Sequence, residues 1–162
     1  LRLMIGDSTA DTSMQRVLVM ECEIDDMNPE LFGVLMDRLY DGGALDVFYV
    51  PVQMKKNRPG TLVTVIASPS RREVLSDIIF RESTSIGLRF SEMTRECLDR
   101  STTTVETQVG SVRVKIAQRG GRIINVAPEF EDCVRLATNC DIPVKEVQAL
   151  AHKAYLERAS SD

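Results

Sequence analysis

Residues 47–67 constrain the fold of this chain more than any other stretch, because they predict a β-hairpin. Residues 47–54 and 61–67 are two runs rich in β-branched and apolar residues, and Asn57-Arg58-Pro59-Gly60 lies between them. Asparagine, proline and glycine between two such runs are typical of a turn. The sequence therefore predicts a strand, a turn at residues 57–60 and a second, antiparallel strand.

Three cations, Lys55, Lys56 and Arg58, occupy the tip of this predicted hairpin. Like charges held close together repel one another, so a tip that only reversed the chain would not require them. One interpretation is a solvated basic loop that discourages pairing between strand edges. The other is a binding site for the oxygens of a phosphate group. The hairpin alone leaves both interpretations open.

A strand and a helix are predicted before the hairpin. Residues 17–24 alternate between apolar and polar, which is typical of a half-buried strand. Asn28 is a favourable N-cap and Pro29 suits the first helical position, so a helix should begin here. An apolar stripe continues from this point to the glycine pair at residues 42 and 43, where the helix should end.

A second helix and a fourth strand are predicted after the hairpin. Ser70 and Glu73 have the spacing of a capping box, and a strand passes through Leu88 and Phe90. The order strand, helix, strand, strand, helix, strand is that of the ferredoxin-like α+β fold, with both helices on one face of an antiparallel sheet. In this topology the end of the first strand, the hairpin tip and the start of the fourth strand meet at one end of the sheet.

The chain divides into three parts on this interpretation. Residues 1–16 are small and polar and predict a linker or frayed leader. Residues 17–100 form the ferredoxin-like domain. Residues 101–162 form a second module, with a β-hairpin over residues 103–109 and 112–116 and two helices opened by Pro128 and Pro143.

Composition limits the classes of function. The formal net charge of −4 argues against nucleic-acid binding, and no apolar run is long enough to span a membrane. The four cysteines lack the spacing of a metal site, and Cys22 and Cys133 fall in apolar patterns that predict buried thiols. With His152 as the only histidine, a zinc site or a serine–histidine–aspartate triad is disfavoured. Reduced thiols fit a cytoplasmic setting.

Polar clusters should meet at the sheet end described above. Asp25 and Asp26 near a helix N-terminus are explained by the helix dipole, but they are also hard-oxygen ligands that Mg²⁺ or Mn²⁺ prefers. Because the basic hairpin tip should lie opposite Asp25 and Asp26, metal binding becomes the favoured interpretation of these two residues. A hydroxyl-rich turn and a following cation should point to the same end: Arg81, Glu82, Ser83, Thr84 and Arg89. The residues thus predict a site for a divalent metal and a polyphosphate or nucleotide.

Several motifs together resemble one family, the LarC nickel-insertion protein of nickel-pincer nucleotide synthesis, in its C-terminal region. The similarity covers roughly residues 17–157. The motifs are Ile24-Asp25-Asp26-Met27-Asn28-Pro29-Glu30, Gly43-Ala44-Leu45-Asp46-Val47, Met54-Lys55-Lys56-Asn57-Arg58-Pro59-Gly60, Phe80-Arg81-Glu82-Ser83-Thr84, Pro128-Glu129-Phe130-Glu131-Asp132-Cys133 and Pro143-Val144-Lys145-Glu146-Val147.

The resemblance implies a CTP-dependent cyclometallase, a nickel chelatase that inserts Ni²⁺ into pyridinium-3,5-bisthiocarboxylic acid mononucleotide while CTP becomes CMP and pyrophosphate. The product is the cofactor of lactate racemase. Full-length members of the family carry an N-terminal region, which is an expected partner of this chain. A homo-oligomer is also expected. The alternatives are a non-catalytic nucleotide-sensing module and an assembly module without a ligand.

The resemblance and the predicted convergence together assign roles to residues. Lys55, Lys56 and Arg58 would hold the phosphates of CTP. Asp25 or Asp26 would bind Mg²⁺ or Mn²⁺, directly or through water. The remaining residues expected around the pocket are Arg81, Glu82, Ser83, Thr84 and Arg89.

Overall fold

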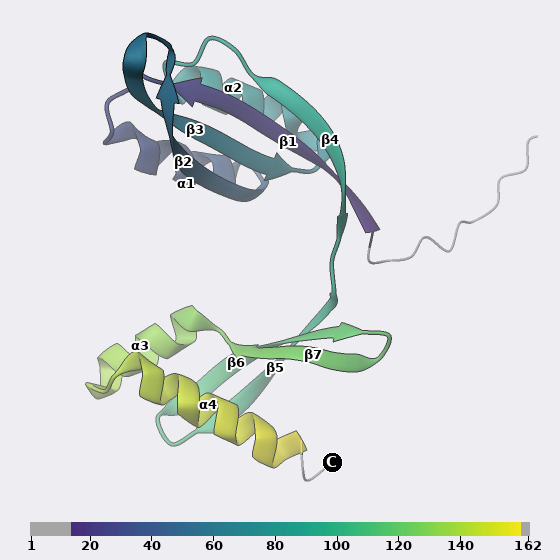
Figure 1. Ribbon diagram of the computed structural model, residues 1–162. Helices are drawn as coiled ribbons and strands as arrows, with labels where there is room; N and C mark the ends of the chain where they lie inside the picture. The colour runs from purple at the N-terminus through teal and green to yellow at the C-terminus, as the bar shows by residue number, and fades with distance from the viewer. Residues whose placement is uncertain (1–13, 160–162) are drawn as a thin grey trace, which may run out of the picture. The chain divides into compact units, whose positions relative to one another are not determined.

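The computed structural model describes residues 14–159 of the 162-residue chain. They form two compact units that divide between Glu96 and Cys97, each with its own core (Figure 1). The predicted leader lies outside the described residues as far as Ser13, and Met14 already belongs to the first strand. No helix within residues 14–159 is both long enough and apolar enough to cross a membrane.

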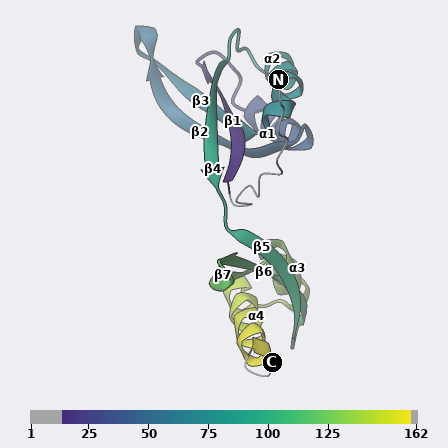
Figure 2. The same cartoon turned by 90° about the vertical axis from the view of Figure 1, so that its right-hand side faces the viewer.

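The first unit has the predicted ferredoxin-like order. Its sheet runs β2-β3-β1-β4 with every neighbouring pair antiparallel, and this confirms the α+β fold class. Figure 1 and the rotated view in Figure 2 show both helices on one face of the sheet. The elements are β1 (Met14–Ile24), α1 (Leu31–Asp41), β2 (Ala44–Met54), β3 (Arg58–Ala67), α2 (Arg72–Glu82) and β4 (Arg89–Glu96).

The core of this unit follows from the two periodicities of the sequence. Alternate residues of β1 point to the helices, and all four predicted core residues of that strand, Leu18, Met20, Cys22 and Ile24, are buried. The helices contribute residues four apart, which share one face of an α-helix: Leu35 and Leu39 from α1, and Leu75 and Ile79 from α2. Cys22 is thus a buried thiol, as expected, and burial raises its pKa.

The turn of the central hairpin differs from the prediction. A short 3₁₀ turn at Lys55–Asn57 closes the hairpin, and Arg58, Pro59 and Gly60 belong to β3 rather than to the turn. Arg58 already pairs with Met54 across the ladder. Pro59 is tolerated because pairing of β3 with β1 begins only at Thr61, so at Pro59 the strand has a paired neighbour on one side only.

The starts of the two helices also differ in part from the prediction. α1 begins at Leu31, so its N-cap is Glu30 rather than Asn28, and Glu30 forms no side-chain capping bond. Asn28 instead accepts a hydrogen bond from the backbone N–H of Glu30 at 3.1 Å, in the turn before the helix. The capping box of Ser70 and Glu73 does not form. A 3₁₀ turn at Pro69–Arg71 precedes α2, so Ser70 lies inside a helical turn, and its hydroxyl is 3.0 Å from that of Ser68.

The second unit packs two helices against a sheet of order β5-β6-β7. Its elements are β5 (Asp99–Thr107), β6 (Gly110–Arg119), β7 (Arg122–Pro128), α3 (Phe130–Cys140) and α4 (Val144–Ala159). Val112, Val114 and Cys133 are fully buried. Asp132 joins α3 to β6 by accepting hydrogen bonds from the backbone N–H and the guanidinium of Arg113, and these donors hold the pKa of Asp132 well below its usual range.

Candidate functional site

The β2–β3 hairpin passes tightly over the end of β1, and Gly60 makes this possible. Pairing of β1 with β3 ends at Ile24 and Thr61, whereas pairing of β2 with β3 continues to Met54 and Arg58. A Cβ atom on Gly60 would lie 2.9 Å from the carbonyl oxygen of Ile24 and 2.4 Å from the sulfur of Met54. Only glycine therefore allows the hairpin tip to lie this close to the residues that follow β1.

Two contacts tie three distant segments together at this sheet end. The guanidinium of Arg58 donates a hydrogen bond to Oδ2 of Asp25 at 3.2 Å, across 33 residues of sequence. The hydroxyl of Thr84 donates to Oδ1 of Asp26 at 2.5 Å, across 58 residues. Since Asp25 and Asp26 are consecutive, the hairpin tip, the end of β1 and the turn before β4 meet at one place. The structure thus brings Asp25, Asp26, Arg58 and Thr84 together.

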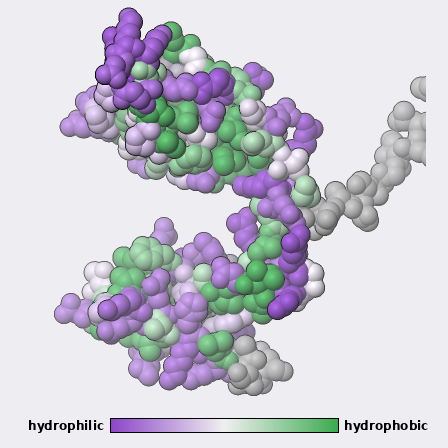
Figure 3. Space-filling view, in the orientation of Figure 1, coloured by the Kyte–Doolittle hydropathy of each residue, from purple (hydrophilic) through white to green (hydrophobic). Residues whose placement is uncertain are grey.

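The hairpin tip carries cations at the surface beside this cluster. Lys55, Lys56 and Arg58 are all exposed, and Figure 3 shows the tip as a hydrophilic projection of the first unit. The side chain of Asp25 is only 16% exposed, and Arg58 provides a neutralising charge for it. Lys56 and Asn57 have positive φ angles of 60° and 59°, which L-residues seldom adopt. Of the three cations at the tip, Lys56 therefore lies on a strained backbone.

Three of the predicted site residues, Arg81, Glu82 and Ser83, have other partners within the protein. Glu82 accepts a hydrogen bond from Arg38 at 2.7 Å and lies 3.7 Å from Arg81, beside the groove between α1 and α2. The Ser83 hydroxyl donates to the carbonyl of Ile79 and so completes the last turn of α2. These residues contact α1 or α2, and the proposed roles of Arg81, Glu82 and Ser83 in the pocket stay predictions.

Arg89 contacts β1 instead of the hairpin tip. Its guanidinium donates to both carboxylate oxygens of Glu23, at 2.7 and 2.5 Å, and lies 3.7 Å from Glu21. The hydrogen bonds from Arg89 lower the pKa of Glu23. Glu21 and Glu23 are not among the site residues predicted from the sequence. Their alternation with the buried residues of β1 places them on the open face of the sheet, which was the available signal.

Two carboxylates at this sheet end are available as ligands for a divalent cation. Asp25 and Asp26 supply hard oxygen donors of the kind that Mg²⁺ and Mn²⁺ take, and one oxygen of each already accepts a hydrogen bond. Within residues 14–159 no group of three or more histidine, cysteine, aspartate or glutamate residues is arranged to hold a metal ion. The donor set fits an ion that takes its remaining ligands from phosphate oxygens and water.

The fold and this sheet end define a two-unit α+β protein whose ferredoxin-like unit gathers acids, cations and a hydroxyl at one end of its sheet. The chain belongs to the nickel insertion protein family, whose family model matches residues 1–148. This confirms the resemblance seen in the sequence motifs.

Individual relatives agree with this membership. A protein of Citrifermentans bemidjiense is 50% identical over 147 residues, which cover 91% of this chain and 37% of that protein. The pyridinium-3,5-bisthiocarboxylic acid mononucleotide nickel insertion protein of Thermotoga petrophila is 40% identical over 143 residues, covering 88% of this chain and 36% of that protein. The chain therefore spans less than half of the length of these relatives.

A solved structure is similar over both units. It is the C-terminal domain of a cyclometallase involved in the synthesis of the NPN cofactor of lactate racemase, in the apo form. The TM-score is 0.83 and the sequence identity is 37%, with 88% of this chain and 98% of that chain covered. This chain thus has the fold of such a C-terminal domain.

Proposed function

We propose that this chain binds CTP together with Mg²⁺ or Mn²⁺ at the sheet end formed by Asp25, Asp26, Arg58 and Thr84. We further propose that, within longer proteins of the family, it supports the insertion of nickel into pyridinium-3,5-bisthiocarboxylic acid mononucleotide, with CTP converted to CMP and pyrophosphate. The names of the Thermotoga relative and of the similar solved domain support the substrate and the reaction class. The region of those relatives that this chain does not cover would complete the activity.

The contact between Arg58 and Asp25 is the observation that carries the proposal. Each group neutralises the other in the structure, and both sit beside the exposed Lys55 and Lys56. A metal-bound triphosphate supplies both charges at once, because its oxygens attract the three cations and its metal attracts the carboxylates. Arg58 uses one of its five N–H donors on Asp25, so further donors remain for phosphate oxygens.

The divalent ion, when bound, would neutralise part of the triphosphate charge. Asp25 and Asp26 are the residues of this chain that would hold it. Thr84 orients Asp26 by its hydrogen bond, and Arg58 orients Asp25. The hydrogen bonds leave the second oxygen of each carboxylate as the donor for the ion or for its bound water.

Variants of the proposed site test it by calorimetric titration with CTP and MnCl₂. Lys55→Ala and Asp26→Ala should each weaken binding about tenfold or more, since a charge-assisted contact is worth roughly 1.5–3 kcal/mol. The double variant should lose less binding free energy than the two single variants lose in sum, because both residues would act on one metal–triphosphate unit. Arg16→Ala, which removes an exposed cation paired with Glu92, is the control and should bind normally. Strictly additive losses would contradict a shared site.

Nucleotide choice and turnover separate the alternatives. CTP should bind more tightly than ATP or GTP, and EDTA or high salt should weaken binding. Equal affinity for the three nucleotides would contradict the assignment of CTP. Production of CMP and pyrophosphate by a full-length relative with nickel and the mononucleotide, reduced by the equivalent substitutions, indicates a part in catalysis. Nucleotide binding without any effect on turnover would indicate a nucleotide sensor instead.

A further inference from the structure

The outer edge of β4 lacks the features that usually protect an edge strand. The opposite edge, β2, contains Pro51 and a register shift between Ala44 and Asp46, and both interrupt strand pairing. β4 contains no proline and pairs with β1 in one unbroken register from Glu96 back to Arg89. Within the described residues its only strand neighbour is β1. One edge of this sheet is therefore open to an added strand.

Three of the four charged side chains of β4 do not guard this edge. Charges on an edge strand ordinarily discourage pairing because a new strand would have to desolvate them. In this unit, three charged side chains of β4 contact β1, the strand on the inner side. The pairs are Arg89 with Glu23, Glu92 with Arg16, and Arg95 with Gln15. These contacts draw the charges towards β1.

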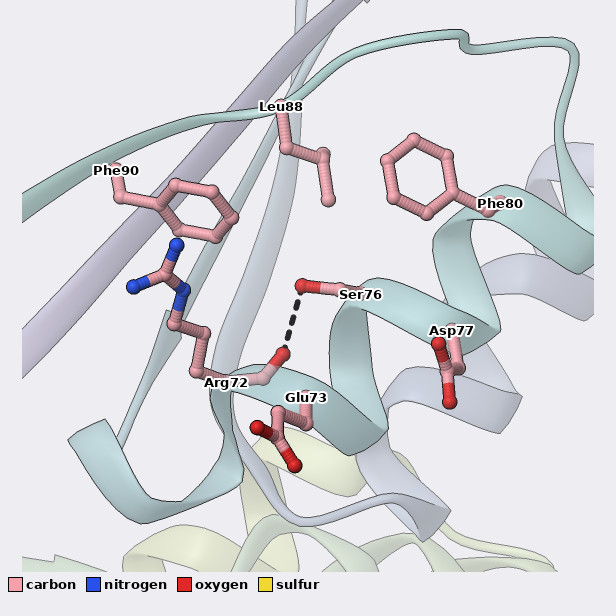
Figure 4. Close-up of a pocket in the computed structure, with 7 residues that line it drawn as sticks. All are labelled: Arg72, Glu73, Ser76, Asp77, Phe80, Leu88 and Phe90. Carbon is pink, nitrogen blue, oxygen red and sulfur yellow. Dashed lines mark hydrogen bonds between the residues drawn. The ribbon is translucent and has the colours of Figure 1, made fainter.

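A hollow of about 480 Å³, lined by both polar and apolar side chains, lies between α2 and the start of β4. We call it the edge hollow, and its lining consists of Arg72, Glu73, Ser76, Asp77, Phe80, Leu88 and Phe90. Figure 4 shows Phe80, Leu88 and Phe90 around it, with Arg72 beside the ring of Phe90. Phe80 is 47% exposed and Phe90 36% exposed. An added strand next to β4 would direct alternate side chains into this hollow and cover these rings.

The charges around the edge hollow favour a basic residue in the added strand. The guanidinium of Arg72 lies 4.1 Å from the centroid of the Phe90 ring, so this cation already has a favourable partner. Glu73 and Asp77 form no ion pair with any residue between 14 and 159. A ligand that brings one cation to the edge hollow would therefore be favoured over a neutral or acidic one.

We propose that the outer edge of β4 and the edge hollow form a docking groove for an extended segment of a partner protein. The segment adds to the sheet as a fifth strand and forms main-chain hydrogen bonds with β4. It places one apolar side chain against Phe80 and Phe90, and a lysine or arginine on the same face beside Glu73 and Asp77.

A second copy of this chain fits the groove poorly. Outward-pointing backbone groups alternate along a strand, so a two-fold axis between two antiparallel copies of β4 must pass through a residue. An axis through Glu92 places Glu92 against its copy. An axis through Met93 places the Glu96 of the copy opposite Phe90, beside Glu73 and Asp77. These are the two central axes, which pair the most residues of β4, and both bring acids together. A basic strand of different sequence avoids this repulsion.

A displayed library of seven-residue peptides with every position randomised tests this proposal on the full chain. Selected peptides should carry lysine or arginine two positions from an apolar residue. They should bind with a dissociation constant of about 100 µM or lower. Replacing the central residue of a selected peptide by proline should abolish binding, because proline cannot donate to the ladder. Replacing the basic residue by glutamate should weaken binding about tenfold.

Two matched variants locate the site. Phe80→Lys places a charge in the edge hollow, whereas Val74→Lys places one on the same helix beside the groove between α1 and α2. The two parent residues are 47% and 46% exposed, so both variants should fold. Phe80→Lys should weaken peptide binding at least tenfold and Val74→Lys less than twofold. Failure to select any binder, binding that survives proline, or equal effects of the two variants would each overturn the proposal.

Discussion

Replacement of Lys56 by glycine should stabilise the first unit relative to replacement of its neighbour Lys55. Lys56 has φ 60° and ψ 23°, which is the left-handed region of the backbone. Its Cβ atom crowds the backbone there, and glycine has no Cβ atom. Lys55 does not have a positive φ, so the same substitution relieves no strain at that position.

The comparison of the two variants isolates the strain. Each variant removes one lysine from the same exposed tip, and each gives the unfolded chain the extra freedom of one glycine. These two effects cancel in the difference between the variants. What remains is the cost of the left-handed conformation for a residue with a Cβ atom, which is about 1–2 kcal/mol. Lys56→Gly should therefore be more stable than Lys55→Gly by this amount.

Urea denaturation of the full chain measures the difference, with amide hydrogen exchange of β2 and β3 reporting on the first unit separately. Ala substitutions serve as controls, since Lys56→Ala keeps a Cβ atom and should not gain the stability of Lys56→Gly. Equal stability of the two glycine variants would refute the argument from backbone strain. Both variants should also bind CTP less tightly if the tip holds phosphates.

Three further predictions concern packing and charge. Gly60→Ala should destabilise the protein by about 1–3 kcal/mol, because the new methyl group meets the carbonyl of Ile24, and it should also weaken CTP binding; unchanged stability in urea would contradict the close approach. Leu35→Ala should cost about 2–5 kcal/mol in the same assay, since Leu35 is fully buried, whereas Leu31→Ala at the 43% exposed position should cost far less. Asp132→Asn should lower the unfolding temperature more at pH 7 than at pH 2. Because Arg113 lowers the pKa of Asp132, its contribution is complete above about pH 4 and is lost as the pH falls through the lowered pKa, so an equal effect at both pH values would contradict it.

Local patterns in the sequence predict the architecture of the first unit well. The alternation along β1 identifies the residues that the structure buries, such as Met20 and Cys22, because the strand period of two is a local property. The order of strands and helices then leaves one common topology, and the meeting of Asp25 with Arg58 follows from it. The motifs also point to the family that the comparisons confirm.

Partner choice among charged side chains depends on tertiary structure. Glu82 contacts Arg38 rather than the hairpin tip, and Arg89 contacts Glu23, because long side chains reach whichever opposite charge lies nearest in space. Such distances depend on how helices cross and strands pair between segments 44 and 66 residues apart. No local pattern in the sequence encodes them.

The sequence by itself determined which residues alternate between core and surface, and hence the ferredoxin-like sheet, because these properties depend on neighbours in the chain. Tertiary structure decided where the hairpin turns. Asparagine, proline and glycine at residues 57–60 are a local turn signal, yet the ladder pairs Arg58 with Met54 and moves the turn to Lys55–Asn57. The pairing of whole strands outweighs the preference of single turn residues, and it leaves Lys56 in a strained conformation at the proposed binding site.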